Sequence, residues 1–261
     1  MTGSAAHSAG TTVRIDRSWA SWQGAHGGYV AALALAAMRA DLAGRTSRPA
    51  PFRTLGAHFL APVDGRPLRF TTHALREGRR TSVSSVTAVQ DGDPVLTGSA
   101  VFGHGGSGPA YTDPTDPPPP ALPRPDDCPT LTLPRDLARF AAHLEIRPAT
   151  DTRPLGGADR AELLAWTRFA DRRPLDAQTL VVLADALPPA LFALWTAPRP
   201  VPTAELTVHF TDALDAGPAE DWVLLRIRTE HAGSGWAIEN SCIWSTDAEL
   251  LALARQARAV R

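Results

Sequence analysis

The order of hydrophobic and polar positions in the first hundred residues predicts one helix followed by four strands. Residues 29–44 (YVAALALAAMRADLAG) are rich in Ala and Leu, which favours a helix that ends at Gly44. The segment is apolar on nearly every face, so the helix should be buried on most sides. Turn signals at 64–65, 77–78 and 91–92 separate the strand-like segments that follow, which are residues 52–60, 68–75, 81–89 and 94–102. A buried helix followed by an antiparallel run of strands is typical of the α+β class.

The second half of the chain repeats this order. Its pattern predicts strands at 139–147 and 163–169, a helix at 179–195, and strands at 204–210, 222–231, 235–244 and 250–260. Pro188 and Pro189 lie inside the helical stretch, and such a pair must kink a helix or begin a new one. The repeated order indicates a tandem duplication of one helix-plus-sheet unit.

An overlay of the two halves places His58-Phe59 on His209-Phe210, residues 29–38 on 180–189, and the turn at 90–92 on the turn at 247–248. Three polar residues of the second half then stand opposite apolar residues of the first: Asp185 opposite Ala34, Thr203 opposite Phe52, and Gln256 opposite Ala100. The overlay therefore predicts that the working polar side chains lie in the second half.

A proline-rich segment separates the two halves. Residues 105–134 hold ten of the chain's 24 prolines, including Pro117 to Pro120. Consecutive prolines block both helix and sheet pairing, so we expect an extended linker. The predicted organisation is a first domain at 11–104, a linker at 105–135 and a second domain at 136–261.

The composition excludes several classes of protein. The net charge of −1 gives no broad basic field, so we expect no nucleic-acid partner. The longest apolar run, around residues 29–38, is about half of what a membrane helix needs, and no signal peptide is visible. We therefore expect no membrane insertion and a cytoplasmic location. The cysteines lack metal-binding spacing, so we expect no metal or cofactor, with Cys128 exposed in the linker and Cys242 buried in a strand.

Six segments in the same order resemble a known family. They are HGGYVAALALAAM, HFLAPVDGRPL and LREGRRTSVSSVTAVQDGDPV in the first half, and LADALPPA, PTAELTVHF and LLALARQARAVR in the second. Together they resemble the double-hotdog acyl-CoA thioesterases of the bacterial thioesterase II family and its actinobacterial relatives. The resemblance covers nearly the whole chain apart from the linker and the extreme N-terminus. It implies an α+β tandem hotdog, with two antiparallel sheets each wrapped around a central helix.

The resemblance also implies a polar trio. In that family an Asp lies on the second central helix, a Thr on the strand after it and a Gln on the last strand, and the matching residues here are Asp185, Thr203 and Gln256. One departure is visible, because the family carries Asp-His two residues after the Thr where this chain has Glu205-Leu206. We expect that departure to alter strand packing and substrate fit rather than the trio.

The chemistry of these side chains suits thioester hydrolysis. Water attacking a thioester needs a base, and an ordinary Asp with a pKa of about 3.9 is a weak one, so we expect burial to raise the pKa of Asp185. The Thr203 hydroxyl and the Gln256 amide can each donate and accept a hydrogen bond, so the trio can fix one water. The alternative is structural: Asp185 caps a second helix at Pro188, Thr203 is an ordinary strand residue and Gln256 lies on a solvated edge.

Two other groups are candidates for substrate binding. Gly27 and Gly28 open the first helix, where free N–H groups favour an oxyanion, although a tight entry turn explains them equally well. The second group flanks a turn and could bind the phosphates of coenzyme A, although a solvated turn is equally consistent: Arg76, Arg79 and Arg80.

The sequence thus favours hydrolysis of acyl-CoA thioesters, or of acyl carrier protein thioesters, to the free acid and the thiol. One alternative is a hydratase or dehydratase on the same fold, which would need an Asp and a His facing one cavity. Another is a non-catalytic acyl-thioester binding protein. Assembly into a homo-oligomer stays open.

Overall fold

The computed structural model describes residues 9–45, 50–105, 122–219 and 221–261. The first half begins with a short 3-10 helix, η1 (Arg17–Trp19), and continues with the long helix α1 (Gly27–Ala43), which confirms the predicted helix and its end at Gly44. Its strands, four of which match the predicted segments closely, are β1 (Ala9–Val13), β2 (Ala20–Ser21), β3 (Gly24–Ala25), β4 (Phe52–Phe59), β5 (Leu68–Arg76), β6 (Thr81–Gln90) and β7 (Asp93–Gly103).

The second half departs from the prediction in two places. Residues 139–147 were predicted as a strand, but Arg139–His143 form a 3-10 helix, η3, and only the following residues join the sheet. The stretch predicted as helical at 179–195 forms two helices, which confirms the break expected at Pro188 and Pro189, but the first helix already ends at Ala184. The elements are η2 (Pro125–Asp127), β8 (Leu144–Pro148), β9 (Glu162–Phe169), α2 (Ala177–Ala184), α3 (Leu191–Leu194), β10 (Thr203–Phe210), η4 (Asp212–Asp215), β11 (Val223–Gly233), β12 (Trp236–Ser245) and β13 (Leu250–Ala259).

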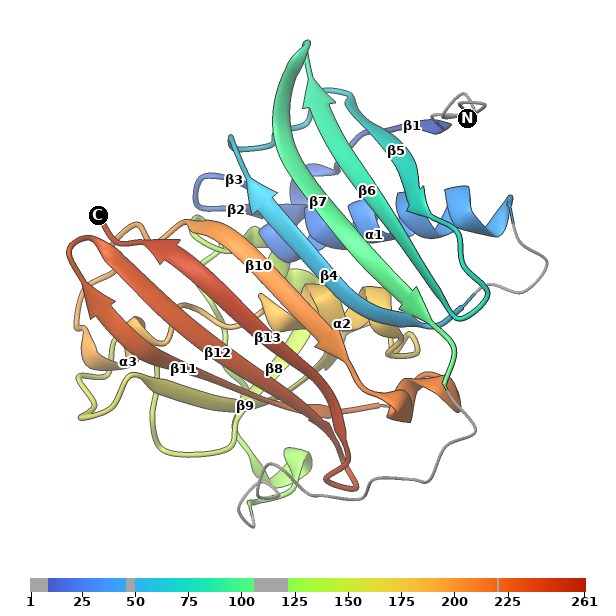
Figure 1. Cartoon of the computed structure of the whole chain (residues 1–261). Helices are drawn as coiled ribbons and strands as arrows, with labels where there is room; N and C mark the ends of the chain where they lie inside the picture. Colours follow the sequence, from blue (N-terminus) through green and yellow to red (C-terminus); the bar gives the residue numbers. More distant parts are fainter. Residues whose placement is uncertain (1–8, 46–49, 106–121, 220) are drawn as a thin grey trace.

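The long strands of both halves form one antiparallel sheet with the helices behind it (Figure 1). Its eleven strands run in the order β1-β5-β6-β7-β4-β10-β13-β12-β11-β9-β8, while β2 and β3 pair separately. The sequence predicted two sheets. The two sets of strands are continuous because β4 of the first half pairs with β10 of the second. This pairing satisfies backbone groups that two free edges would expose.

The register at this central pair is symmetrical. The overlay that places His58 on His209 also places Thr54 on Glu205, and the sheet pairs His58 with Glu205 and Thr54 with His209. The neighbouring strands follow the same relation, because Leu55 pairs with Ala100 as Leu206 pairs with Gln256. The register therefore confirms that Gln256 is the counterpart of Ala100.

The same relation extends one step further along the strands. Phe52 pairs with Phe102 in the first half, and Thr203 pairs with Arg258 in the second. The two phenyl rings lie 5.2 Å apart between centroids, so this position is an aromatic contact in the first half. In the second half it is a polar contact between a hydroxyl and a guanidinium.

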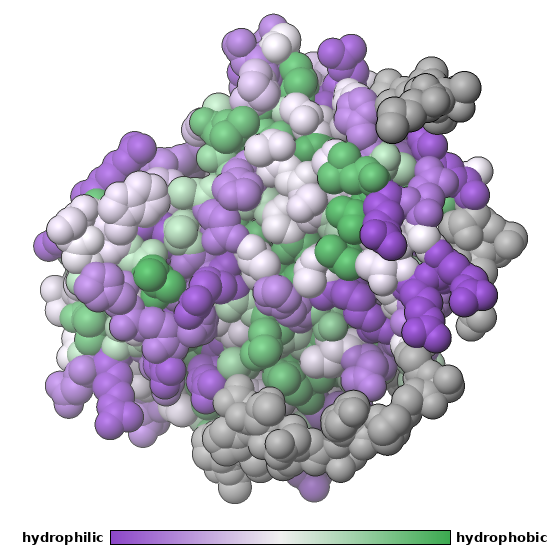
Figure 2. Space-filling model, in the orientation of Figure 1, coloured by the Kyte–Doolittle hydropathy of each residue, from purple (hydrophilic) through white to green (hydrophobic). Residues whose placement is uncertain are grey.

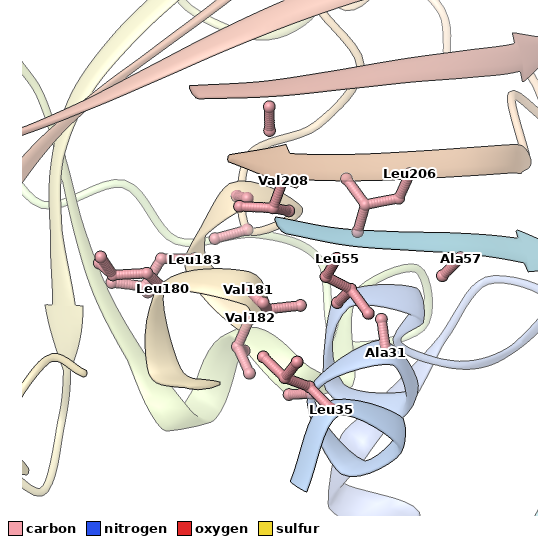
Figure 3. Close-up of a cluster of buried hydrophobic side chains, with 14 of the residues drawn as sticks. Ala31, Leu35, Leu55, Ala57, Leu180, Val181, Val182, Leu183, Leu206 and Val208 are labelled. Atoms are coloured by element: carbon pink, nitrogen blue, oxygen red, sulfur yellow. The ribbon is translucent and has the colours of Figure 1, made fainter. Parts of the chain in front are cut away.

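The two longer helices pack against each other as well as against the sheet. α1 contacts β5 and β6 on one side and α2 on another, which explains why it is apolar on nearly every face. Leu55 of β4 and Leu206 of β10 face the helices. There they join one buried cluster with Leu35 of α1 and Val181 of α2 (Figure 3). The core is therefore continuous across the two halves.

Part of the proline-rich segment packs on the sheet. Residues 106–121, including Pro117 to Pro120, lie outside the described residues, so the predicted extended conformation is not described there. Further along, the Trp166 indole N–H donates to the Pro123 carbonyl over 3.0 Å. Cys128 is buried in a small cluster with Trp166 and Cys242, so the prediction of an exposed Cys128 is wrong, whereas Cys242 is buried in β12 as predicted.

The sheet face that turns away from α1 and α2 mixes hydrophilic and hydrophobic residues (Figure 2). Strand β6 illustrates the cause, since its residues alternate between buried and partly exposed along most of its length, as expected for a sheet with one face on the core. Among the described residues, no helix has the length and apolar character needed to cross a membrane.

Candidate active site

The predicted trio comes together where the two halves meet. Asp185 is the C-terminal cap of α2, Thr203 opens β10 and Gln256 lies near the end of β13. α2 stops at Ala184 because the chain turns ahead of Pro188 and Pro189, and this turn aims Asp185 at the first turn of α1.

Asp185 has hydrogen-bond donors on both carboxylate oxygens. Oδ2 accepts from the Gly28 N–H over 2.9 Å, and Oδ1 accepts from Gln256 Nε2 over 2.8 Å. The Arg258 guanidinium adds an ion pair with Oδ1 at 3.3 Å. The side chain is only 10% exposed, so these contacts replace most of the water that a free carboxylate would hold. Asp185 therefore does not cap a second helix, and it binds instead to the helix of the other half.

Thr203 and Gln256 belong to the same network. The Thr203 hydroxyl accepts from Arg258 Nη1 over 2.8 Å and from Gln256 Nε2 over 3.3 Å. Because it accepts twice, its own proton remains available for a further acceptor. Gln256 Oε1 accepts from Arg258 Nη2 over 2.8 Å. Gln256 is 1% exposed and lies between β10 and β12, not on a solvated edge.

Arg258 is a site residue that sequence reasoning missed. It contacts all three members of the trio and forms a buried ion pair through Nε with Glu239 of β12. Glu239 in turn accepts from the Ala190 N–H over 2.6 Å and from the Thr229 hydroxyl over 3.1 Å. A signal was present, because residues two apart on a strand share a face, so a buried Gln256 implies a buried Arg258.

His26 is the second missed residue. The residue is 2% exposed, and its ring stacks on Phe140 with 4.0 Å between centroids. Nε2 donates to the Asp185 carbonyl over 2.8 Å, and Nδ1 accepts from the Tyr29 N–H over 3.2 Å. Both nitrogens are therefore used. Burial lowers the pKa of His26 despite the nearby Asp185 carboxylate, which favours the neutral ring.

The pKa of Asp185 moves in the direction opposite to the prediction. Burial by itself raises it, as expected, but His26, Arg258, the Gln256 amide and the Gly28 N–H together outweigh that effect and hold the pKa of Asp185 below its ordinary value. The Arg258 guanidinium, the Gln256 amide and the Gly28 N–H still lower the pKa of Asp185 when the His26 ring is neutral. These contacts favour the ionised form of Asp185.

An apolar cavity of about 280 Å³ opens beside this network. Asp185, Thr203 and Arg258 line one wall, whereas Gln256 lies behind that wall. Most of the remaining lining is hydrophobic and comes from both halves, including Trp22, Phe59, Val63, Leu137, Phe140 and Phe192. A few convergent polar groups on an apolar cavity are the usual form of a small-molecule site.

The two glycines at the start of α1 differ in their surroundings. The Gly28 N–H is bound to Asp185, so it is not free for an oxyanion. A Cβ on Gly28 would lie 2.8 Å from the Val181 carbonyl oxygen, so glycine is required there for the close approach of the two helices. Gly27 lines the cavity, and no group among the described residues accepts its N–H.

The three candidate arginines lie elsewhere. Arg76, Arg79 and Arg80 are exposed around the turn between β5 and β6. Glu77 of that turn pairs with Arg45, just past the C-terminal end of α1. The turn is thus roughly 25 Å, the length of α1, from Gly27 and Gly28. None of the three lines the cavity.

Comparison with known proteins agrees with the fold. Residues 15–103 match the family model of the acyl-CoA thioesterase N-terminal domain, and residues 125–260 match that of the acyl-CoA thioesterase C-terminal domain. The chain belongs to the acyl-CoA thioesterase family. The two matches confirm the family resemblance that the six sequence segments indicated. The protein is therefore a thioester hydrolase.

Three solved structures with the same fold match this chain over nearly its whole length. A putative thioesterase from Novosphingobium aromaticivorans is 26% identical with a TM-score of 0.79, covering 97% of this chain and 96% of that chain. A hotdog-fold protein of unknown function from Alicyclobacillus acidocaldarius is 24% identical with a TM-score of 0.84, covering 97% and 93%. A putative thioesterase II from Thermobifida fusca is 22% identical with a TM-score of 0.80, covering 97% and 92%. No curated protein matches the sequence.

Proposed function

We propose that this thioesterase hydrolyses acyl-CoA to the free acid and coenzyme A with a water that Asp185, Thr203 and Gln256 position, the first two by direct contact and Gln256 by holding their side chains. The observation that carries the proposal is the direct contact of these side chains at the wall of an apolar cavity. Gln256 Nε2 lies 2.8 Å from Asp185 Oδ1 and 3.3 Å from Thr203 Oγ1. The apolar lining suits an acyl chain, and the polar wall suits the thioester group.

Asp185 and Thr203 can hold one water between them. Asp185 Oδ2 accepts a single N–H, from Gly28, so it can accept a second hydrogen bond from the water. The Thr203 hydroxyl can donate its remaining proton to the same water. One lone pair of the water oxygen then accepts the hydrogen bond from the Thr203 hydroxyl. The other lone pair is free to attack the thioester carbon.

The low pKa of Asp185 defines its part in the reaction. A weak base orients the water and stabilises the positive charge that develops on it, and it takes the proton as the oxygen–carbon bond forms. The attack gives a tetrahedral intermediate, whose carbon–sulfur bond then breaks. The thiol of coenzyme A, with a pKa of about 8.5 by analogy with cysteine, leaves as a thiolate and is protonated by Asp185 or solvent.

The carbonyl oxygen of the thioester is assigned to the Gly27 N–H. This group lies at the N-terminal end of α1, where the helix dipole favours negative charge, and it lines the cavity beside Asp185. Gln256 has a different role because it lies behind the wall. It holds the Asp185 carboxylate and the Thr203 hydroxyl in place.

The architecture proposed for this function is a tandem hotdog with domains at 11–104 and 136–261, joined by residues 105–135. The symmetrical register of β4 with β10 supports this division, as do the separate matches of the two halves to two family models.

A dehydratase is the second candidate, and one observation favours it. His26 Nε2 lies 3.5 Å from Asp185 Oδ2, and both residues line the cavity. Fold similarity extends to the dehydratase domain of PpsC from Mycobacterium tuberculosis, with 13% identity and a TM-score of 0.55. However, both nitrogens of His26 are bound to backbone groups, so the ring has no free position for a substrate proton.

The test is a thiol-release assay over a panel of saturated, branched and aromatic acyl-CoAs, with Asp185→Asn beside the wild type. We expect kcat of the variant to fall by about two orders of magnitude or more, because the amide cannot take the proton. Asp93→Asn, at an exposed position, is the matched control. Unchanged activity in Asp185→Asn would remove Asp185 as the base. Binding of acyl-CoA with no thiol release by the wild type would favour the non-catalytic binding protein, and hydration of an enoyl-CoA would favour the dehydratase.

A further inference from the structure

A second cleft, of about 920 Å³, lies next to the acyl cavity. Five arginines line it, from segments far apart in the sequence: Arg14, Arg17, Arg66, Arg135 and Arg139. Three acidic residues, Asp16, Asp64 and Asp136, also line it. The cleft is therefore locally positive, although the chain as a whole carries a net charge of −1.

Most of these arginines have no ion-pair partner in the part of the chain that the structure describes. Arg66 is paired with Asp64 and Asp91. For the other four, no carboxylate within the described ranges forms an ion pair: Arg14, Arg17, Arg135 and Arg139. Asp16 is occupied in part, because its carboxylate accepts from the Ser18 N–H. Unpaired guanidinium groups that face one cleft are available to an anion.

The cleft adjoins the acyl cavity. Ser21, Gly24, Ala25 and Val63 line both. One elongated ligand can therefore place an apolar end against the hydrophobic lining and an anionic end among the arginines. The polar wall of Asp185 and Thr203 belongs to the acyl cavity and not to the arginine-lined cleft.

The cleft is built from ordered elements of both halves. Arg17 begins η1, and Arg139 begins η3. Trp19 of η1 stacks on His143 of η3 with 4.2 Å between centroids, and His143 also binds the Ser18 hydroxyl over 2.8 Å. These contacts fix the backbone of the two segments, so that Arg17 and Arg139 line the same cleft.

We propose that this arginine-lined cleft binds the phosphate-bearing nucleotide end of coenzyme A, an inference that rests on the proposed acyl-CoA hydrolysis. A nucleotide with a diphosphate and a further phosphate presents several anionic groups, and guanidinium groups bind phosphate oxygens in a bidentate manner. The concave form of the site fits a small nucleotide that lies against the arginines of η1 and η3. This assignment replaces the exposed turn of Arg79 and Arg80, which lies at the far end of α1.

The experiment compares two substrates that carry the same acyl group, the coenzyme A thioester and the pantetheine thioester, which has no phosphate. The double variant Arg135→Gln/Arg139→Gln is measured beside Arg79→Gln/Arg80→Gln. For the first variant we expect the KM for acyl-CoA to rise about tenfold or more with kcat within about twofold, since two charge-assisted contacts are lost. Its kcat/KM on the pantetheine thioester should equal that of the wild type. The second variant should match the wild type on both substrates.

Three results would overturn the assignment. The first is an unchanged KM for acyl-CoA in the Arg135/Arg139 variant, and the second is an increase in the Arg79/Arg80 variant instead. The third is an equal loss on both substrates, which would mean that the arginines support the fold rather than the phosphates. If adenosine 3′,5′-bisphosphate does not inhibit while a carrier-protein thioester is hydrolysed in an Arg135-dependent way, the anion is that of a carrier protein and the nucleotide assignment fails.

A different result separates this inference from the proposed function. If the wild type hydrolyses neither substrate, the proposed function fails. Calorimetric titration with adenosine 3′,5′-bisphosphate then tests the cleft alone: binding by the wild type that weakens about tenfold or more in the Arg135/Arg139 variant supports it, and equal binding or no binding overturns it.

Discussion

The carboxylate of Asp185 accepts the backbone N–H of Gly28 over 2.9 Å, so the residue that ends α2 binds the first turn of α1. The partner groups lie 157 positions apart in the chain. His26, which caps α1 through the Tyr29 N–H, also donates to the Asp185 backbone carbonyl. The position of the proposed base therefore depends on how closely the two helices approach.

Gly28→Ala should weaken both the fold and the activity. The added Cβ would lie 2.8 Å from the Val181 carbonyl oxygen and 2.9 Å from the Asp185 Cβ, so the helices must separate. We expect the free energy of unfolding to fall by about 1–3 kcal/mol, as for other overpacked sites. kcat should fall as well, because Asp185 moves with α2. Urea unfolding and steady-state kinetics measure the two effects.

Gly44→Ala is the matched control at the other end of α1. A Cβ there would meet its nearest atom, the Asp41 carbonyl oxygen, at 3.5 Å, which is ordinary van der Waals contact, and the residue already has helical backbone angles. This variant should keep or slightly raise stability and should not alter kcat. Similar losses in both variants would show that the close approach at Gly28 is not the cause.

Thr203→Val should lower kcat while the protein stays folded. The change keeps the shape but removes the hydroxyl that is expected to direct the water, so we expect a loss of about tenfold to a hundredfold. Thr203→Ser keeps the hydroxyl and should restore most of the activity. Equal activity of the Val and Ser variants, measured by thiol release, would exclude a role for the hydroxyl.

Arg258 should set the acid limb of the pH profile. Because the pKa of Asp185 lies below its ordinary value, the carboxylate stays ionised as the pH falls, and kcat/KM should persist to below about pH 4 as far as Asp185 controls it. Removal of the guanidinium should raise the pKa of Asp185 and move the acid limb to higher pH. The double variant Arg258→Gln/Glu239→Gln is the one to measure, because Arg258→Gln alone would leave Glu239 buried without its cation. An acid limb that stays in place or moves to lower pH would contradict this assignment.

His26 should make stability depend on pH below about 7. Burial lowers its pKa in the folded protein, whereas the unfolded chain has a value of about 6.5. Between these values the unfolded state binds a proton that the folded state does not, so the free energy of unfolding should fall as the pH decreases. His26→Asn, which can still cap α1, should reduce the slope in urea unfolding at pH 7.5, 6.5 and 5.5. His143 contributes in the same direction, because burial lowers its pKa too, so some slope should remain. The same slope in wild type and variant would exclude His26.

The elements of the fold were largely readable from the sequence, because they follow from local patterns. α1 and strands β4 to β7 lie within a residue or two of the predicted ranges. The errors fell where local patterns conflict. Residues 139–143 have strand-like composition but form η3, whose Trp19–His143 stacking depends on a distant residue. The apolar run at 179–195 contains Pro188, which ended the helical hydrogen bonding early.

The site was predicted only in part. Asp185, Thr203 and Gln256 were found through a family resemblance, and the structure brings them together. Arg258 and His26 were missed because their importance arises from contacts with residues far away in the chain. The pKa of Asp185 was wrong in direction for the same reason, since burial is visible in a sequence and the guanidinium beside the carboxylate is not.

The central pairing of β4 with β10 has a consequence for stoichiometry. A two-fold arrangement of identical halves would offer two equivalent centres, but here the positions related to Thr203, Gln256 and Arg258 hold Phe52, Ala100 and Phe102. Those side chains have no polar group to orient a water, and the two phenyl rings contact each other instead. The first half instead supplies cavity lining, such as Phe59 and Val63, and the Gly28 N–H that binds Asp185. Each chain should therefore turn over one acyl group at a time.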